Sequence, residues 1–125
     1  MLASSQLMTF AATKQPEKAR AFYVEVLGLV LVAHEPTALV FDANGSMLRV
    51  SIVKEFSPQP FTVLGWRVAE MRRMRRDLAA KGVIFENYGF PGQDTENIWT
   101  TPDGAQVAWF KDPDGNLLSL TQFPE

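Results

Sequence analysis

The sequence predicts an α+β fold made of two βαβββ modules, residues about 5–56 and about 61–123, within a single domain of 125 residues. Two observations predict this duplication. The pattern D-x-[ND]-G-x-[ML]-L-x-[VL] occurs at 42–50 and again at 112–120, each time ahead of the last expected strand of a module. Two amphipathic helix patterns that end at a glycine, at 16–28 and 70–82, precede these turns in the same order.

The first module begins with an expected strand at Leu7–Thr13. Pro16 suits the first turn of the helix that follows, because its missing N–H is not needed there. An apolar face recurs along this helix at three- and four-residue spacing, and Gly28 ends it. Strands are then expected at 29–33, 38–42 and 47–53, with Asn44–Gly45 as a hairpin turn. The segment EFSPQPF has two prolines and no periodicity, which indicates a linker between the modules.

The second module repeats the order. A strand is expected at 62–68, followed by a helix with Met71, Met74 and Leu78 on its apolar face and Gly82 at its end. A strand at Val83–Glu86, a loop at 87–96 and further strands near 97–101, 105–111 and 117–122 complete the module.

The composition indicates a soluble, cytoplasmic protein. Apolar residues make up 46% and charged residues 21% of the chain, which excludes a disordered chain, and no apolar run is long enough to span a bilayer. The N-terminus lacks the pattern of a secretory signal, and there is no cysteine. A net charge of −2 provides no global attraction for nucleic acid or an anionic membrane, so neither is an expected partner.

Three segments resemble one family. PEKARAFYVEVLGL is similar to the first helix of the vicinal-oxygen-chelate superfamily, which includes glyoxalase I, bleomycin-resistance proteins and extradiol dioxygenases. VLGWRVAEMRRMRRDLAAKGV and VAWFKDPDGNLLSL resemble its second-half helix and closing hairpin. The resemblance implies the glyoxalase/bleomycin-resistance fold, in which the two modules form a curved mixed sheet, or half-barrel, around a cleft for a small molecule.

The same resemblance implies a metal site that this sequence has lost. The family's ligands are His, Glu or Gln on strands lining the cleft, and their positions fall on Met8, Val63 and Ser119. The closing strand of the first module, 46–53, has no carboxylate, imidazole or amide. Thioether, alkyl and hydroxyl groups do not hold a hard or borderline divalent metal. We therefore expect no metal and no other cofactor.

Five residues are predicted to bind a ligand. Arg49 occupies the position of the repeat that matches Ser119, so both side chains should point to the same face of their strands. If that face lines the cleft, Arg49 would bind an anion there; if it does not, both residues would be solvent-exposed. Trp66, Trp99 and Trp109 could stack on an aromatic ligand, or could serve as core or dimer contacts.

Other polar residues support weaker hypotheses. Candidate acid–base groups for a metal-independent enzyme are His34, Glu86, Tyr88 and Asp94, although for His34 a rim or turn position beside Glu35 is the favoured interpretation. The arginine run on the second helix invites a nucleic-acid interpretation, but a solvated helix face explains it better. The run consists of Arg72, Arg73, Arg75 and Arg76.

These inferences favour a metal-free protein that binds or sequesters a small molecule, anionic or aromatic, and that forms a homodimer. Two alternatives stay open. One is a metal-independent lyase, isomerase or similar enzyme acting on a small carbonyl or aromatic substrate. The other is a structural dimer with a vestigial cleft.

Overall fold

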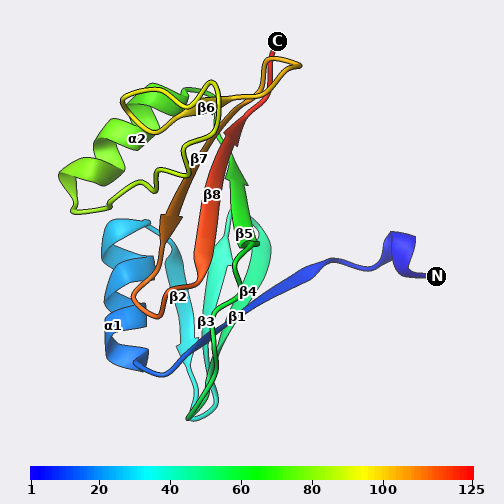
Figure 1. Ribbon diagram of the computed structural model, residues 1–125. Helices are drawn as coiled ribbons and strands as arrows, with labels where there is room; N and C mark the ends of the chain where they lie inside the picture. The colour runs from blue at the N-terminus through cyan, green and yellow to red at the C-terminus, as the bar shows by residue number, and fades with distance from the viewer. The chain divides into compact units, whose positions relative to one another are not determined.

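Each half of the chain forms a four-stranded mixed sheet with a helix against one face, in a computed structural model that describes all residues 1–125 (Figure 1). The α+β fold class is confirmed. Unit 1 comprises Met1–Pro58 together with Pro113–Asn116, and unit 2 comprises Gln59–Asp112 together with Leu117–Glu125. The assignment of both units to a single domain stays a prediction. None of the helices has the length and apolar character that crossing a membrane requires.

Unit 1 has the strand order β1-β4-β3-β2, with β1 and β4 parallel and the other neighbours antiparallel. A short 3-10 turn, η1, precedes β1, and the helix α1 continues directly into a π-helical turn, η2. The elements are η1 (Leu2–Ser4), β1 (Met8–Thr13), α1 (Pro16–Ala21), η2 (Phe22–Val26), β2 (Val30–His34), β3 (Ala38–Ala43) and β4 (Ser46–Ile52).

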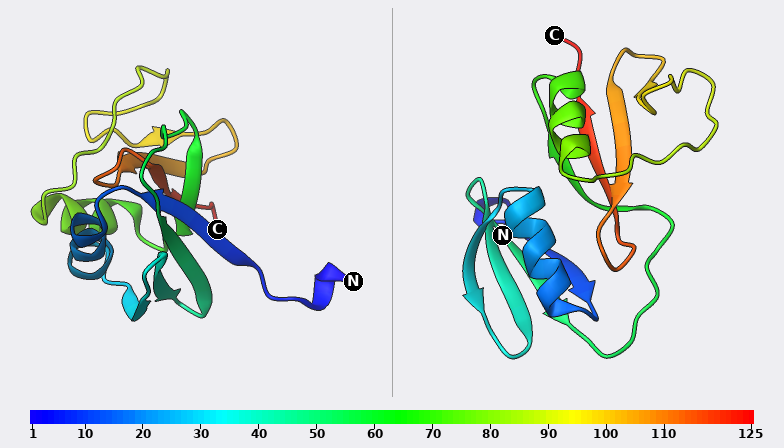
Figure 2. Two further views of the ribbon diagram at one scale, coloured as in Figure 1. Left: turned by 90° about the horizontal axis from the view of Figure 1, so that it is seen from below. Right: turned by 90° about the vertical axis from the view of Figure 1, so that its left-hand side faces the viewer.

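Helix α1 covers one face of the unit 1 sheet (Figure 2). The Tyr23 ring is fully buried and lies 5.4 Å from the Phe41 ring on β3, measured between centroids. Phe41 pairs with Leu48 on β4, and Leu48 alternates with the exposed Met47. Successive strand residues point to opposite faces of the sheet. One face is therefore packed against α1, and we call the other, which α1 does not cover, the open face.

The predicted helix at 16–28 is confirmed, with a change of geometry in its last turn. Pro16 stands at its start as expected, and the hydrogen bond from Leu27 N to Phe22 O (3.0 Å) closes a five-residue turn in place of a four-residue one. Gly28 then adopts φ +76°, a left-handed conformation that suits glycine, and ends the helix.

The second copy of the repeated turn secures the start of α1. Asp114 accepts hydrogen bonds from the Lys14 backbone N–H at 2.9 Å and from the Thr13 hydroxyl. Asn116 Nδ2 donates to the carbonyl of Ala12 at 2.8 Å. In the first copy, Asp42 accepts a hydrogen bond from the Gly45 N–H of its own hairpin at 2.9 Å, and the Gly45 carbonyl accepts one from Gln6 Nε2 at 2.6 Å. The two copies of the motif therefore form similar turns with different partners.

Unit 2 has the order β5-β8-β7-β6, again with the first pair parallel and the others antiparallel. Helix α2 lies against one face of this sheet (Figure 2). Its core contains Met71 and Leu78 from the helix and Phe110, Leu118 and Leu120 from the strands, all buried. The elements are β5 (Thr62–Arg67), α2 (Met71–Ala80), β6 (Trp99–Thr100), β7 (Gln106–Lys111) and β8 (Leu117–Gln122).

The strand expected at Val83–Glu86 is wrong. Only Phe85 pairs with the sheet, through a single bridge to Phe110, and Glu86 N donates to the Trp109 carbonyl at 2.8 Å. Phe85 is buried while Ile84 is 79% exposed, so one side chain anchors this segment to the core. The chain then leaves the sheet as a loop, and the edge strand is the two-residue β6.

Candidate functional site

The register of the unit 2 strands decides which side chains share the open face of that sheet. On β8, Leu118 and Leu120 are buried on the helix side, and Gln122 accepts a 2.6 Å hydrogen bond from the N–H of Met71 on α2. Ser119 therefore points to the open face. It pairs with Trp109 on β7 and with Gly65 on β5, which places both of those residues on the open face as well.

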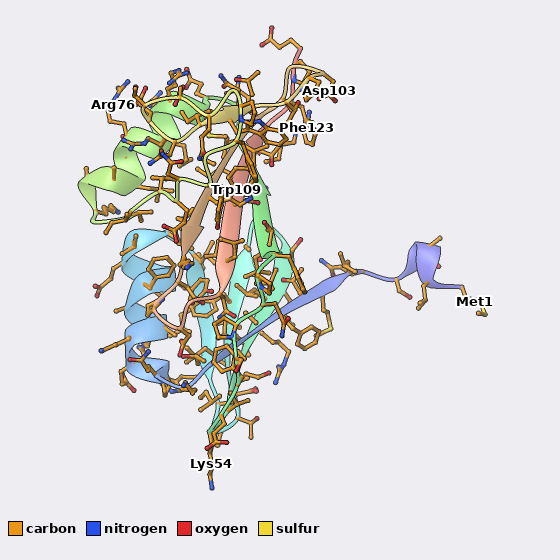
Figure 3. The ribbon with its side chains drawn as sticks, in the orientation of Figure 1. Met1, Lys54, Arg76, Asp103, Trp109 and Phe123 are labelled. Atoms are coloured by element: carbon orange, nitrogen blue, oxygen red, sulfur yellow. The ribbon has the colours of Figure 1, made fainter.

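Four aromatic side chains gather on this open face, and we call them the aromatic cluster: Tyr88, Phe90, Trp99 and Trp109. Trp99 and Trp109 are stacked, with centroids 5.9 Å apart and an interplanar angle of 27°. Tyr88 and Phe90 meet the Trp109 ring almost perpendicularly, at 5.4 Å and 5.7 Å. Figure 3 labels Trp109 beside strands β7 and β8. Offset and edge-to-face arrangements at such distances are favourable aromatic contacts.

The loop that carries Tyr88 and Phe90 is held mainly by the side chain of Gln93. Gln93 Oε1 accepts from the Tyr88 N–H at 2.9 Å, and its Nε2 donates to the carbonyls of Glu86 (2.9 Å) and Asn97 (3.2 Å). Trp99 adds one more hydrogen bond to the loop, from its indole N–H to the Pro91 carbonyl at 3.1 Å. The Gln93 side chain thus supplements the limited backbone pairing of this segment with β6, which consists of the Gln93–Trp99 bridge and the hydrogen bond from Thr100 N to the Gly92 carbonyl (3.4 Å).

Two charged groups lie beside the aromatic cluster. Lys111, on the same face of β7 as Trp109, forms an ion pair with Glu86 (Nζ to Oε1, 3.2 Å). Burial, together with the negative charge of Glu86, raises the pKa of the Tyr88 phenol, while Lys111 opposes this shift. Tyr88 therefore stays protonated at neutral pH and can donate a hydrogen bond.

In unit 1, Arg49 lies on the open face of the sheet. It alternates with the buried Leu48 and Val50 on β4, and it pairs across the sheet with Phe10 on β1. Arg49 Nη2 forms an ion pair with Glu35 Oε1 at 3.1 Å, with 29% of the arginine side chain exposed. Any anion that binds Arg49 must share it with Glu35.

The structure separates the five residues predicted from sequence. Arg49 and Ser119 each lie on the face of their own sheet that its helix does not cover, but Ser119 is buried there, with only 7% of the residue exposed. Trp99 and Trp109 are brought together, but Trp66 pairs with the buried Leu120 and lies on the opposite face of the unit 2 sheet.

Sequence reasoning missed Phe90 and gave Tyr88 a different role. Both belong to the segment NYGFPG, in which glycines separate the aromatic residues. Neither ring belongs to a helical or strand pattern that would explain a large aromatic residue at its position. Two such rings in a loop therefore indicate a contact with another part of the fold.

Two of the four candidate acid–base residues, His34 and Asp94, are engaged away from the aromatic cluster. His34 Nδ1 lies 3.2 Å from Nη1 of Arg20, a residue of α1. Burial raises the pKa of Asp94, but hydrogen bonds from Arg72 and from the N–H groups of Ile98 and Glu96 outweigh it and hold that pKa below its ordinary value. Asp94 is thus a structural carboxylate that stays ionised.

Three of the four arginines of α2 have partners within unit 2. Arg72 contacts Asp94 (2.8 Å) and Glu96 (2.6 Å), and Arg73 contacts Glu70 (3.4 Å). Arg75 donates to the Glu96 carbonyl and lies over the Phe85 ring. These contacts agree with the interpretation of a solvated, ion-paired helix face.

The donor groups of the chain do not fit a catalytic divalent metal. The residues at the positions implied by the family resemblance are Met8, Val63 and Ser119, and Ser119 lies between Trp109 and Gly65. No three His, Asp or Glu side chains come together anywhere in the chain. Hard and borderline metals need several such oxygen or nitrogen ligands.

Comparisons with known proteins agree with this fold. The family model described as Glyoxalase/Bleomycin resistance protein/Dioxygenase superfamily matches residues 6–120. None of the curated proteins matches the chain. Among solved structures, TnmS3, an antibiotic binding protein from Streptomyces sp. CB03234, is 26% identical with a TM-score of 0.73, and the match covers 99% of both chains. Lactoylglutathione lyase from Agrobacterium tumefaciens is 19% identical with a TM-score of 0.73, covering 94% of this chain and 93% of its own.

We predict that the purified protein carries no stoichiometric transition metal, because its donor set lacks the required ligands. Elemental analysis after extensive dialysis should find well under one Zn, Ni, Fe or Mn per chain. One tightly held metal per chain, whose removal by a chelator changes the circular dichroism spectrum, would contradict this.

Proposed function

The chain belongs to the Glyoxalase/Bleomycin resistance protein/Dioxygenase superfamily, and from that membership we propose that it binds a small aromatic molecule without using a metal. The binding surface we propose is the open face of the unit 2 sheet around Trp109. The observation that carries this proposal is the aromatic cluster, where four large rings gather on a sheet face that α2 does not cover.

The exposure of these rings supports a binding role. Tyr88 and Phe90 are each 43% exposed although they contact other aromatic rings. Rings that served only the core would be expected to be buried as fully as Phe110 is. An aromatic surface with a few polar groups beside it is typical of small-molecule sites, and Lys111, Glu86 and the Tyr88 hydroxyl provide those groups here.

The likeness to TnmS3 supports the same proposal. That protein is described as antibiotic-binding, and it matches this chain over nearly the full length of both. A role in binding or sequestering a bioactive aromatic compound would need neither a metal nor an acid–base pair. The two charged groups beside the cluster neutralise each other as an ion pair, which favours binding over proton transfer.

We expect Trp109→Ala to weaken the binding of a planar aromatic probe by about tenfold or more, because an aromatic contact and its buried area are both lost. The probes are anthracene-9-carboxylate and 9-aminoacridine, followed by fluorescence anisotropy. Trp66→Ala is the matched control, since it removes the same side chain from the opposite face of the sheet. Equal weakening by the two substitutions in folded protein would contradict a site at Trp109.

We propose that Arg49 contacts the anionic group of a ligand that has one. Losing a charge-assisted hydrogen bond costs roughly 1.5–3 kcal/mol, and the existing pair with Glu35 places the expected loss at the lower end. Arg49→Ala should therefore weaken the binding of a small anionic probe, benzoate, to unit 1 by about tenfold and leave that of the cation benzylammonium nearly unchanged. Arg72→Ala, on the ion-paired face of α2, is the control and should affect neither probe. Unchanged affinity for benzoate in Arg49→Ala would contradict this role.

We further propose that a second copy of the chain covers apolar side chains of unit 1, giving a homodimer. Met8, Phe10 and Met47 are 40–56% exposed and adjacent on the open face of its sheet, and large exposed apolar patches are uncommon on monomers. Light scattering at micromolar concentration should give twice the 14.0 kDa mass of one chain. A mass of one chain under these conditions would contradict the proposal.

A further inference from the structure

The two tryptophans of the aromatic cluster leave no space for a ligand between them. Their centroids are 5.9 Å apart, whereas a ring held between two others needs about 7 Å, twice the carbon–carbon contact distance. A ligand that stacks on Trp109 must therefore approach from another side. Tyr88 and Phe90 already lie against the Trp109 ring, at 5.4 Å and 5.7 Å.

The contact that Tyr88 and Phe90 make with Trp109 is incomplete. Both rings meet it nearly perpendicularly, with interplanar angles of 79° and 76°, so neither makes the broad face-to-face contact of a stacked ring. Each is also 43% exposed. A flat ligand stacked on Trp109 would make the face-to-face contact that these two rings do not make, while Phe90 would give up its contacts with Trp109 and with the Trp99 ring, whose centroid lies 5.5 Å away.

The segment that carries the two rings is attached to the rest of unit 2 by a small number of hydrogen bonds. It lies outside any strand, in the loop that connects α2 to β6 (Figure 2). Gly89 and Gly92 flank Phe90 with φ of +71° and +90°, and glycine enters and leaves such conformations without the steric cost of a side chain. Among the hydrogen bonds that hold the segment to its surroundings, the Tyr88 N–H donates to Gln93, the Trp99 indole N–H donates to the Pro91 carbonyl, and the Thr100 N–H donates to the Gly92 carbonyl at 3.4 Å.

We propose that Tyr88 and Phe90 occupy the place of the ligand on Trp109, and that binding displaces the segment 88–92, with the Gln93 side chain contributing part of the cost of displacement. This inference rests on the proposed function and adds the ligand class. Two rings leave when the segment moves, so the matching ligand is a planar, fused aromatic system of two or three rings. Gln93 acts as a positioning residue, because it holds the loop and does not touch the ligand.

The test measures the sign of the change in affinity. If the rings occupy the ligand's place, Phe90→Ala removes a competitor and should tighten anthracene-9-carboxylate by about two- to tenfold, the equivalent of one aromatic pair contact. Gln93→Ala should also tighten it, and stopped-flow mixing should show this as a faster association rate with little change in dissociation. Phe123→Ala is the control, since that ring is 52% exposed and lies over Arg67.

The opposite sign would overturn the inference. If Phe90→Ala weakens the probe as Trp109→Ala does, the loop rings are a fixed wall of the site and the ligand stacks on them. If the wild type binds and Phe90→Ala and Gln93→Ala bind equally well, the segment has no part in binding, and the inference fails while the proposed function stands. If neither the wild type nor Phe90→Ala binds either planar probe, the proposed function fails and the inference fails with it.

Discussion

The pairing of β7 with β8 is the constraint on which the candidate site depends. Phe110 pairs with Leu118 and Ala108 pairs with Leu120, and all four side chains are buried. A shift of one residue in one strand would turn its buried side chains out to the open face. Each buried leucine or phenylalanine is worth about 1.5–3 kcal/mol, so the register is held by several kcal/mol of core packing. The position of Trp109 on the open face follows from this core and needs no interaction of its own.

The duplicated turn shows how two similar modules acquired different roles. In the first copy, Asp42 closes its own hairpin through the Gly45 N–H. In the second copy, Asp114 and Asn116 bind the backbone around Thr13, whose side chain is completely buried. A polar group at such a position is expensive unless it is hydrogen-bonded, so these partners account for the acidic and amide residues of the turn. The sequence repeat reveals the common turn, whereas the difference in partners exists only in the folded chain.

Periodicity predicts the elements of this protein well and their tertiary contacts poorly. Helices α1 and α2 were predicted because apolar residues recur at helical spacing and glycines end both patterns. The failure at Val83–Glu86 has a local cause, since one buried phenylalanine anchors a segment that otherwise runs through a loop. A β-rich tetrapeptide does not distinguish these cases, because pairing with a neighbouring strand is decided elsewhere in the chain.

The candidate site was predictable in part for the same reason. Side chains alternate along Leu64–Gly65–Trp66 on β5, so Trp66 lies on the same face as the buried Leu64. This alternation alone separates Trp66 from the residues on the face of Gly65, which include Ser119 and Trp109. The contact between Trp99 and Trp109 could not be predicted in this way, because it depends on the pairing of β6 with β7. The positions of Tyr88 and Phe90 depend on the side-chain bonds of Gln93, for which the sequence carries no periodic signal.

Charge compensation determines what the two open faces can recognise. Arg49 is paired with Glu35 at 3.1 Å, and Lys111 with Glu86 at 3.2 Å. All four groups are partly exposed, so each pair contributes little to stability and can exchange its partner at modest cost. An anionic ligand must nevertheless compete with a carboxylate that is already in place, and a cationic ligand must compete with an arginine or a lysine. Neither sign of charge gains a large advantage. Aromatic surface has no such competitor apart from the chain's own rings, and it is therefore the feature of unit 2 that is best suited to select a ligand by shape.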